Sequence, residues 1–256
     1  MLARQSGRAT AHYPDLANKS VFVSGGATGI GEAIVRAFTG QDARVTFVDL
    51  NVAAGESLAA ELGHSATFAT CDVTDTAALE TAIDSAATKG LDVLVNNAAN
   101  DLRMPLADIG PLEWQQAVDV NLRHQFFASR RAALHMTPKA AGSIINFGSV
   151  APQIMVPDLA VYSACKAAVR GLTRSLANDL GPAGIRVNSV VPGAVLTSKQ
   201  RALWYPDQSA IDAMVARQCI PRELDGDDIA QMVLFLASDV SAACTAQEFI
   251  VDGGIS

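Results

Sequence analysis

Short apolar runs alternate along the chain with longer stretches in which apolar residues recur at helical spacing. Apolar runs of about four to eight residues are typical of buried strands, and apolar residues three and four positions apart are typical of helices. The runs predict strands at residues 19–24, 43–48, 66–70, 91–95, 143–147, 185–191 and 248–251. The amphipathic stretches predict helices at residues 32–39, 56–62, 76–88, 111–135, 160–180 and 227–238.

This strand–helix alternation predicts an α/β fold. Right-handed crossovers then give a single doubly wound Rossmann domain, with a seven-stranded parallel sheet flanked by helices. We expect this domain to span residues 18–256 and residues 1–17 to be a loosely held N-terminal extension. Ligands in such a sheet bind at the carboxyl ends of the strands.

Composition excludes several classes of function. The chain has 256 residues, half of them apolar, with 26 acidic and 19 basic residues and a formal charge of −7. The sequence has no stripe of basic residues, so we do not expect it to bind nucleic acid. Its apolar runs are all shorter than the ~18 residues that a membrane-spanning helix needs. The N-terminus lacks the apolar core of a signal peptide. Four widely spaced cysteines suggest reduced thiols, a cytoplasmic protein and no metal site.

A glycine-rich turn follows the first predicted strand and has the spacing Gly25-x-x-x-Gly29-x-Gly31. Strand, glycine turn and helix together present backbone N–H groups to a phosphate. Tight turns use the same residues, so the turn alone is weak evidence.

Asp49 ends the second predicted strand, about 20 residues after the turn. A carboxylate there can accept hydrogen bonds from the adenosine ribose and would repel a 2′-phosphate. No lysine or arginine near it would compensate, so NAD is favoured over NADP. The alternative is that Asp49 caps the helix beginning near Val52.

Tyr162 and Lys166 are four residues apart on a predicted helix and therefore share one face. A nearby ammonium favours the phenolate, so we expect Lys166 to lower the pKa of Tyr162 and make it a general base. Ser149 follows the strand at 143–147 and would return its hydroxyl to the same place. Alone, such a Tyr–Lys pair is more often simple packing of a lysine along a ring.

With these residues in order, the chain resembles the short-chain dehydrogenase/reductase family from about residue 19 to residue 254. The matching motifs are Ser24-Gly25-x-x-x-Gly29-Ile30-Gly31, Asp49, Asp72-Val73, Asn96-Asn97-Ala98, Asn121, Ser149, Tyr162-x-x-x-Lys166 and Pro192-Gly193. Ser24 stands where the family usually has threonine, and Ala99 where it usually has glycine.

The resemblance implies four catalytic residues. Tyr162 would be the acid/base, Lys166 would lower its pKa and hold the nicotinamide ribose, Ser149 would bind the reacting oxygen, and Asn121 would hold a relay water. Implied NAD-binding residues are Ser24, Gly25, Thr28, Gly29, Ile30, Asp49, Leu50, Asp72, Val73, Asn97, Ala98, Tyr162, Lys166, Pro192, Gly193, Val195 and Thr197. More ordinary roles stay open: Asn121 could satisfy helix backbone, and Ser149 or Thr197 could be helix caps.

A narrower resemblance, to the D-xylose and L-arabinose type of sugar 1-dehydrogenases, implies a substrate. Such enzymes oxidise the anomeric hydroxyl of an aldose to a lactone. A sugar pocket needs several hydrogen-bonding side chains and an apolar face. The expected substrate residues are Asn100, Asp101, Asn146, Ser149, Gln153, Tyr162, Gln200 and Trp204. We also expect a mobile lid near residues 196–221 and, from the family, a homotetramer paired through the helices at 111–135 and 160–180.

Three readings remain open at this point. The first is an NAD-dependent aldose or polyol dehydrogenase. The second is an enzyme for another alcohol or ketone, such as a sugar acid or a 3-oxoacyl thioester, although Asp49 weighs against a biosynthetic NADPH-dependent reductase. The third is a non-catalytic cofactor-binding scaffold, which the presence of both Tyr162 and Lys166 disfavours.

Overall fold

Seven parallel strands form one sheet in the order β3-β2-β1-β4-β5-β6-β7. The computed structural model describes residues 10–205 and 207–256. The strands are β1 Ser20–Ser24, β2 Arg44–Asp49, β3 Ala66–Thr70, β4 Val93–Asn96, β5 Gly142–Phe147, β6 Ile185–Pro192 and β7 Glu248–Val251. The predicted seven-stranded parallel sheet is therefore confirmed. The strand order reverses between β1 and β4, and the carboxyl ends of strands diverge there to leave a crevice.

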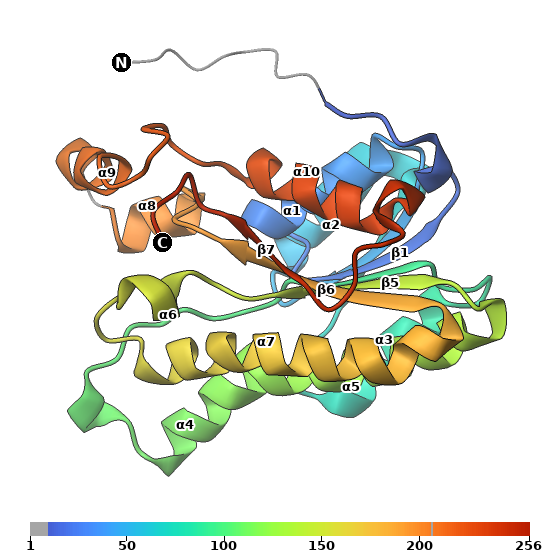
Figure 1. Ribbon diagram of the computed structural model, residues 1–256, viewed down its shortest axis with the longest axis horizontal. Coiled ribbons are helices and arrows are strands. Elements are labelled where there is room, and N and C mark those ends of the chain that lie inside the picture. Colours follow the sequence, from blue (N-terminus) through green and yellow to red (C-terminus); the bar gives the residue numbers. More distant parts are fainter. Residues whose placement is uncertain (1–9, 206) are drawn as a thin grey trace.

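Helices cover both faces of the sheet (Figure 1). One layer contains α1 Gly29–Thr39, α2 Val52–Leu62 and α10 Gly226–Ala237, and the other contains α3 Thr76–Ala86, α4 Pro111–Val118, α5 His124–Met136 and α7 Ala160–Leu180. Three short helices lie beyond the carboxyl edge of the strands: α6 Ala151–Ile154, α8 Ser198–Leu203 and α9 Gln208–Val215. The lid region predicted at residues 196–221 contains α8 and α9.

Alternate residues of β1, an interior strand of the sheet, pack into two separate apolar cores. Val21 and Val23 of β1 pack in the core under α1 and α10, whereas Phe22 packs in the core under α3 and α5. All five residues of β1 are buried. Because both faces are covered, the strand reads as a continuous apolar run rather than an alternating one.

The predicted helix at residues 111–135 is two α-helices joined by a π-helical turn at Asp119–Arg123. The apolar periodicity continues through the turn, so the sequence pattern does not reveal it. A π-turn inserts a wider backbone loop into a helix and often occurs at functional sites. Here it contains Asn121.

The described part of the N-terminal segment is docked, so the prediction of a loose extension is wrong for it. Leu16 is fully buried, and the Asp15 carboxylate accepts hydrogen bonds from the Ser238 hydroxyl and the Asp239 N–H, both at 2.8 Å. The rest of the predicted extension, residues 1–9, lies outside the described residues. In residues 10–205 and 207–256, no helix is long and apolar enough to span a membrane.

Candidate active site

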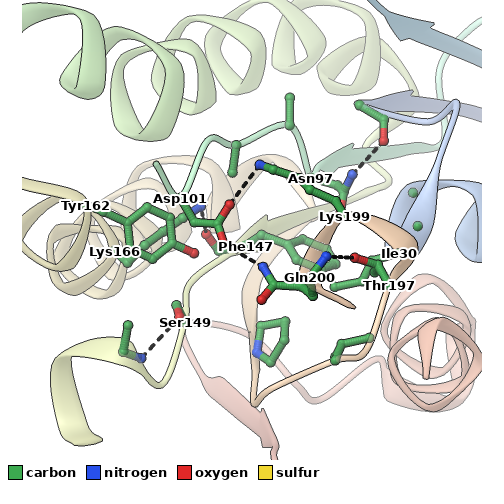
Figure 2. A pocket seen from close by; sticks show the side chains of 18 of the residues that line it. Ile30, Asn97, Asp101, Phe147, Ser149, Tyr162, Lys166, Thr197, Lys199 and Gln200 are labelled. Atoms are coloured by element: carbon green, nitrogen blue, oxygen red, sulfur yellow. Dashed lines mark hydrogen bonds and ion pairs between the residues drawn. The ribbon is translucent and has the colours of Figure 1, made fainter. Parts of the chain in front are cut away.

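A cavity of about 550 Å³ opens at the carboxyl edge of the sheet, where β1, β2, β4, β5 and β6 end. Most of the predicted site residues line it. Those on its walls are Gly25, Thr28, Gly29, Ile30, Asp49, Leu50, Asp72, Val73, Asn97, Ala98, Asp101, Ser149, Tyr162, Lys166, Pro192, Gly193, Val195, Thr197, Gln200 and Trp204. Figure 2 shows several of these side chains around the common space. Its volume falls in the range of about 300–1,000 Å³ usual for ligand pockets.

The glycine-rich turn is held in one conformation by its surroundings. Gly25 has φ +68°, which favours glycine, and a Cβ atom at Gly31 would lie 1.8 Å from the Gly25 carbonyl oxygen. The Asn97 amide donates hydrogen bonds to the carbonyl oxygens of Ser24 and Gly25, at 3.1 and 2.8 Å. The first turn of α1 therefore points its free N–H groups at the cavity, as phosphate binding requires.

Asp49 lies on the cavity wall and does not cap α2. Its carboxylate accepts hydrogen bonds from the backbone N–H groups of Ala27 and Asn51, both at 3.0 Å. Asn51 caps α2 instead, because its side chain accepts a hydrogen bond from the Ala54 N–H at 3.2 Å. The cap alternative for Asp49 is therefore wrong, and the carboxylate stands beside the glycine-rich turn.

Two residues predicted to bind the cofactor, Ser24 and Thr197, make structural hydrogen bonds. Ser24 is fully buried and is not a lining residue; its hydroxyl accepts a hydrogen bond from the Ala98 N–H at 3.2 Å. Thr197 lines the cavity and also caps α8, accepting a hydrogen bond from the Gln200 N–H at 3.2 Å. The residues present suit a dinucleotide: a phosphate-binding turn at one side of the cavity and a carboxylate at the ribose position.

Tyr162 and Lys166 project from the first turns of α7 toward the end of β5. The buried Lys166 ammonium donates a hydrogen bond to the Phe147 carbonyl oxygen at 2.9 Å and lies 5.7 Å from the centre of the Tyr162 ring. The Ser149 hydroxyl interacts with the Tyr162 phenol and accepts a hydrogen bond from the Ala151 N–H at 3.1 Å. Ser149 thus supports the start of α6 and also faces the phenol.

The predicted fall in the pKa of Tyr162 is wrong. Burial raises the pKa of the phenol to about 12, the contact with Ser149 partly opposes this, and the Asp101 charge adds to the rise. Burial also lowers the pKa of Lys166 to about 8. Burying a charged group costs free energy, so burial favours the neutral form of both side chains. The prediction rested on the four-residue spacing of Tyr162 and Lys166, which does not show how deeply the two side chains are buried.

Asn121 anchors the loop that follows β4. Only 1% exposed, it accepts a hydrogen bond from the Asn100 N–H at 2.9 Å and donates to the carbonyl oxygens of Asn100 and Ala117, both at 3.0 Å. The alternative that the Asn121 side chain satisfies backbone groups is therefore confirmed, because its three hydrogen bonds all join it to backbone atoms. The π-turn thus brings this side chain into contact with the loop after β4 and with the end of α4.

His124, at the start of α5, is completely buried. Burial, together with the nearby Lys166 charge, lowers its pKa to about 3. It is therefore neutral at every ordinary pH and does not add a second cation beside Lys166.

Three residues predicted to bind substrate do not line the cavity. Asn146 is fully buried and its amide donates to the Thr173 hydroxyl at 3.1 Å. Gln153 is exposed, with its amide placed to donate to the carbonyl oxygens of Val150 and Ser149. Asn100 is exposed and is held through its backbone by Asn121. Residue type suggested these three, but their side-chain directions depend on packing.

Two charged residues of the cavity wall were missed as site residues. Lys199 donates to the Asp101 carboxylate at 2.8 Å, and the Arg103 guanidinium lies 4.4 Å from the centre of the Trp204 ring. Each pair joins positions about a hundred residues apart, so no local spacing signals it. Only the opposite charges of Asp101 and Lys199 offered a hint.

The fold and the cavity define a nucleotide-dependent oxidoreductase, and comparisons with known proteins agree. A family profile described as enoyl-(acyl carrier protein) reductase matches residues 25–256. The chain is 44% identical over 252 residues to a probable galactose dehydrogenase of Rhizobium meliloti, covering 96% of this chain and 98% of the relative. It is 39% identical over 248 residues to a D-xylose 1-dehydrogenase of Caulobacter vibrioides, with the same coverage of both chains.

Other relatives act on different molecules. A 3-alpha-(or 20-beta)-hydroxysteroid dehydrogenase of Mycobacterium tuberculosis is 39% identical over 93% of this chain and 90% of that relative. A solved structure named as a short chain dehydrogenase/reductase family protein superposes with a TM-score of 0.85 at 33% identity, covering 94% of this chain and 98% of that one. The chain belongs to the short-chain dehydrogenase/reductase family, and it is an NAD(P)-dependent enzyme that acts on CH–OH donors.

The lowered pKa of Lys166 predicts a pH-dependent stability. Between pH 8 and its ordinary value of 10.5, the folded protein holds fewer protons on Lys166 than the unfolded chain. Folding therefore gains stability as the pH rises through this window, by up to about 3 kcal/mol. Lys166→Met should lose this gain. Urea unfolding of both NAD-free proteins from pH 7 to 10 measures the difference, and parallel pH curves would contradict the assignment.

Proposed function

We propose that this enzyme is an NAD-dependent dehydrogenase that oxidises the C1 hydroxyl of an aldose to a lactone. The observation that carries the proposal is the composition of the cavity end that Tyr162 and Ser149 face. Asp101 and Gln200 give it hydrogen-bonding groups, and Trp204 gives it a broad apolar face. This mixture suits a sugar ring, which presents hydroxyls at its edge and C–H groups on its faces. The relatives named for galactose and D-xylose support the same substrate class.

In the proposed reaction, Tyr162 takes the proton from the C1 hydroxyl while Ser149 holds the same oxygen. Bound NAD would supply the hydride acceptor and, in its oxidised form, a positive charge on the nicotinamide ring. A phenol with a pKa of about 12 keeps its proton at neutral pH, so its deprotonation requires such added positive charge. Lys166, with a pKa of about 8, is mostly charged at neutral pH and supplies part of it.

NAD would be held along the cavity wall from the glycine-rich turn to Lys166. The N–H groups at the start of α1 would bind its phosphates, and Asp49 would accept hydrogen bonds from the adenosine ribose. Asp72 and Val73 line the cavity beyond Asp49 and would contact the adenine side. The Asp49 carboxylate favours NAD over NADP because a 2′-phosphate would meet a like charge.

A substrate panel tests this proposal. Initial rates should be measured with D-xylose, galactose, other aldoses, polyols, sugar acids, a hydroxysteroid and a 3-hydroxyacyl thioester, each with NAD and with NADP. We expect the fastest turnover with an aldose and NAD. Turnover confined to a steroid or a thioester would replace the sugar assignment with the second reading, in which another secondary alcohol is the substrate.

Tyr162→Phe removes only the phenolic oxygen and tests the acid/base role. We expect kcat to fall by roughly 10²–10⁴-fold, because a positioned proton acceptor contributes that much. NAD affinity, measured by titration calorimetry, should stay within about twofold. Turnover close to that of the parent protein would remove Tyr162 from the role.

Asp49→Ala tests the cofactor preference. We expect weaker NAD binding and a smaller difference in activity between NAD and NADP, because the variant loses both the hydrogen-bond acceptor for the ribose and the charge that repels a 2′-phosphate. The substitution also frees the Ala27 and Asn51 N–H groups, so thermal unfolding must be compared in parallel. If a stably folded variant kept the same ratio of activity with NAD to activity with NADP, the role of Asp49 would be only to hold the glycine-rich turn.

We further propose that the enzyme works as a homotetramer in the cytoplasm. A hollow between α4, the π-turn, α5 and α7 is lined by the apolar residues Val118, Leu122, Phe126, Phe127, Ala168 and Leu172 and by Arg123. Trp114 on α4 and Phe126 on α5 are large exposed apolar residues of the same helix layer, which favours burial against a second copy. Free cysteines at positions 71, 165, 219 and 244 fit a reducing compartment.

Size in solution tests the assembly. Light scattering at micromolar concentration should give a mass of four chains, and Phe126→Glu should shift it toward smaller species. A monomer in the parent protein would contradict the homotetramer.

A further inference from the structure

Hydrogen bonds and a cation–ring contact join the loop after β4 to α8 and to Trp204, the residue that follows it. The Asp101 carboxylate accepts hydrogen bonds from Lys199 at 2.8 Å and from the Gln200 amide at 2.5 Å. A short distance along the same loop, the Arg103 guanidinium lies over the Trp204 ring at 4.4 Å. All five residues line the cavity, and Figure 2 shows the Asp101, Lys199 and Gln200 side chains meeting there.

These contacts tie together side chains that also face the sugar end of the cavity. Both oxygens of Asp101 are occupied, one by Lys199 and the other by Gln200. The Lys199 ammonium reaches the Asn100 side-chain oxygen as well, at 3.4 Å. Asp101 therefore holds α8, which carries Gln200 and leads into Trp204, and each of its oxygens can still accept a second hydrogen bond from a sugar hydroxyl.

The closed arrangement carries a cost that opposes it. Within the described part of the chain, the Trp204 indole N–H is buried and has no hydrogen-bond partner. A buried donor that lacks a partner disfavours the state that buries it, since water would satisfy it if the segment moved away. The Lys199–Asp101 pair is itself weak, because the Lys199 side chain is 50% exposed. The contacts of Asp101 and Arg103 with this segment must therefore offset the cost of the buried indole N–H.

We propose that Asp101, Arg103 and Lys199 form a clasp that positions Gln200 and Trp204 over the substrate end of the cavity. They are positioning residues: they act through α8 rather than on the reacting atoms. The clasp holds α8 down before the sugar arrives, so the sugar meets a formed pocket wall. Its effect on sugar binding rests on the proposed function, whereas its effect on Trp204 does not.

Variants of Lys199 and Arg103 isolate the clasp better than variants of Asp101. The Asp101 charge acts on both Tyr162 and Lys166, so removing it would change the proton chemistry as well. Lys199→Met breaks one contact and Arg103→Gln breaks the other. Lys139→Met is a matched control, because Lys139 pairs with Asp92 at the opposite edge of the sheet.

Fluorescence of Trp204 measures the clasp without a substrate. The chain has two tryptophans, and Trp114 is half exposed on α4, so a Trp114→Phe background leaves Trp204 as the single reporter. With NAD present, Lys199→Met and Arg103→Gln should each raise the acrylamide quenching constant of Trp204 by about two- to fivefold. A change of this size corresponds to the loss of one partly exposed contact. The Lys139→Met control should match the background. Equal quenching in all four proteins would overturn the proposal.

Kinetics with D-xylose and galactose test the consequence for the sugar. In both clasp variants the KM for sugar should rise by roughly fivefold while kcat stays within about twofold, because saturating sugar drives closure. A fall in kcat with an unchanged KM would contradict a positioning role. If the parent protein oxidises no aldose of the panel, the proposed function fails, yet increased quenching in the variants still establishes the clasp.

Discussion

The hydrogen bond from the buried Lys166 ammonium to the Phe147 carbonyl oxygen is the contact on which the site depends. It ties α7 to the last residue of β5, and so sets where Tyr162, one turn earlier on α7, meets Ser149, two residues beyond β5. The same carbonyl accepts a hydrogen bond from Gln125 at 3.3 Å, whose amide also donates to the Asn121 carbonyl oxygen at 3.1 Å. One carbonyl thus links α7, β5 and the π-turn.

A buried polar network extends this constraint beneath the cavity. The Asn96 amide donates to the side-chain oxygens of Asn146 and Ser129, at 2.9 and 3.1 Å, and Asn146 donates in turn to Thr173. These contacts connect β4, β5, α5 and α7. Hydrogen bonds in an apolar interior fix relative positions more strictly than apolar packing does, because each has a required direction. The network explains why Asn146 belongs to the scaffold and not to the pocket.

The strands and most residues of the cavity wall could be predicted, because they depend on local sequence patterns. Every predicted strand is present, and the glycine-rich turn, Asp49, Tyr162 and Lys166 reach one cavity because parallel strands end at one edge. Features that depend on packing were not predicted. The π-turn at Asp119–Arg123 keeps the apolar period of a helix, the pKa of Tyr162 follows its burial, and Asp101 meets Lys199 only through the fold. Gln153 was chosen by residue type, which does not give a side-chain direction.

Transfer of deuterium from C1 of the sugar tests the central claim most directly. The enzyme would be incubated with NAD and D-xylose or galactose carrying deuterium at C1 only, and the reduced cofactor and the sugar product analysed by mass spectrometry. The account predicts one deuterium in the reduced cofactor and none at C1 of a lactone product. Reduced cofactor without deuterium, from a sugar product that still carries the label, would show that the hydride leaves another carbon and would contradict oxidation at C1.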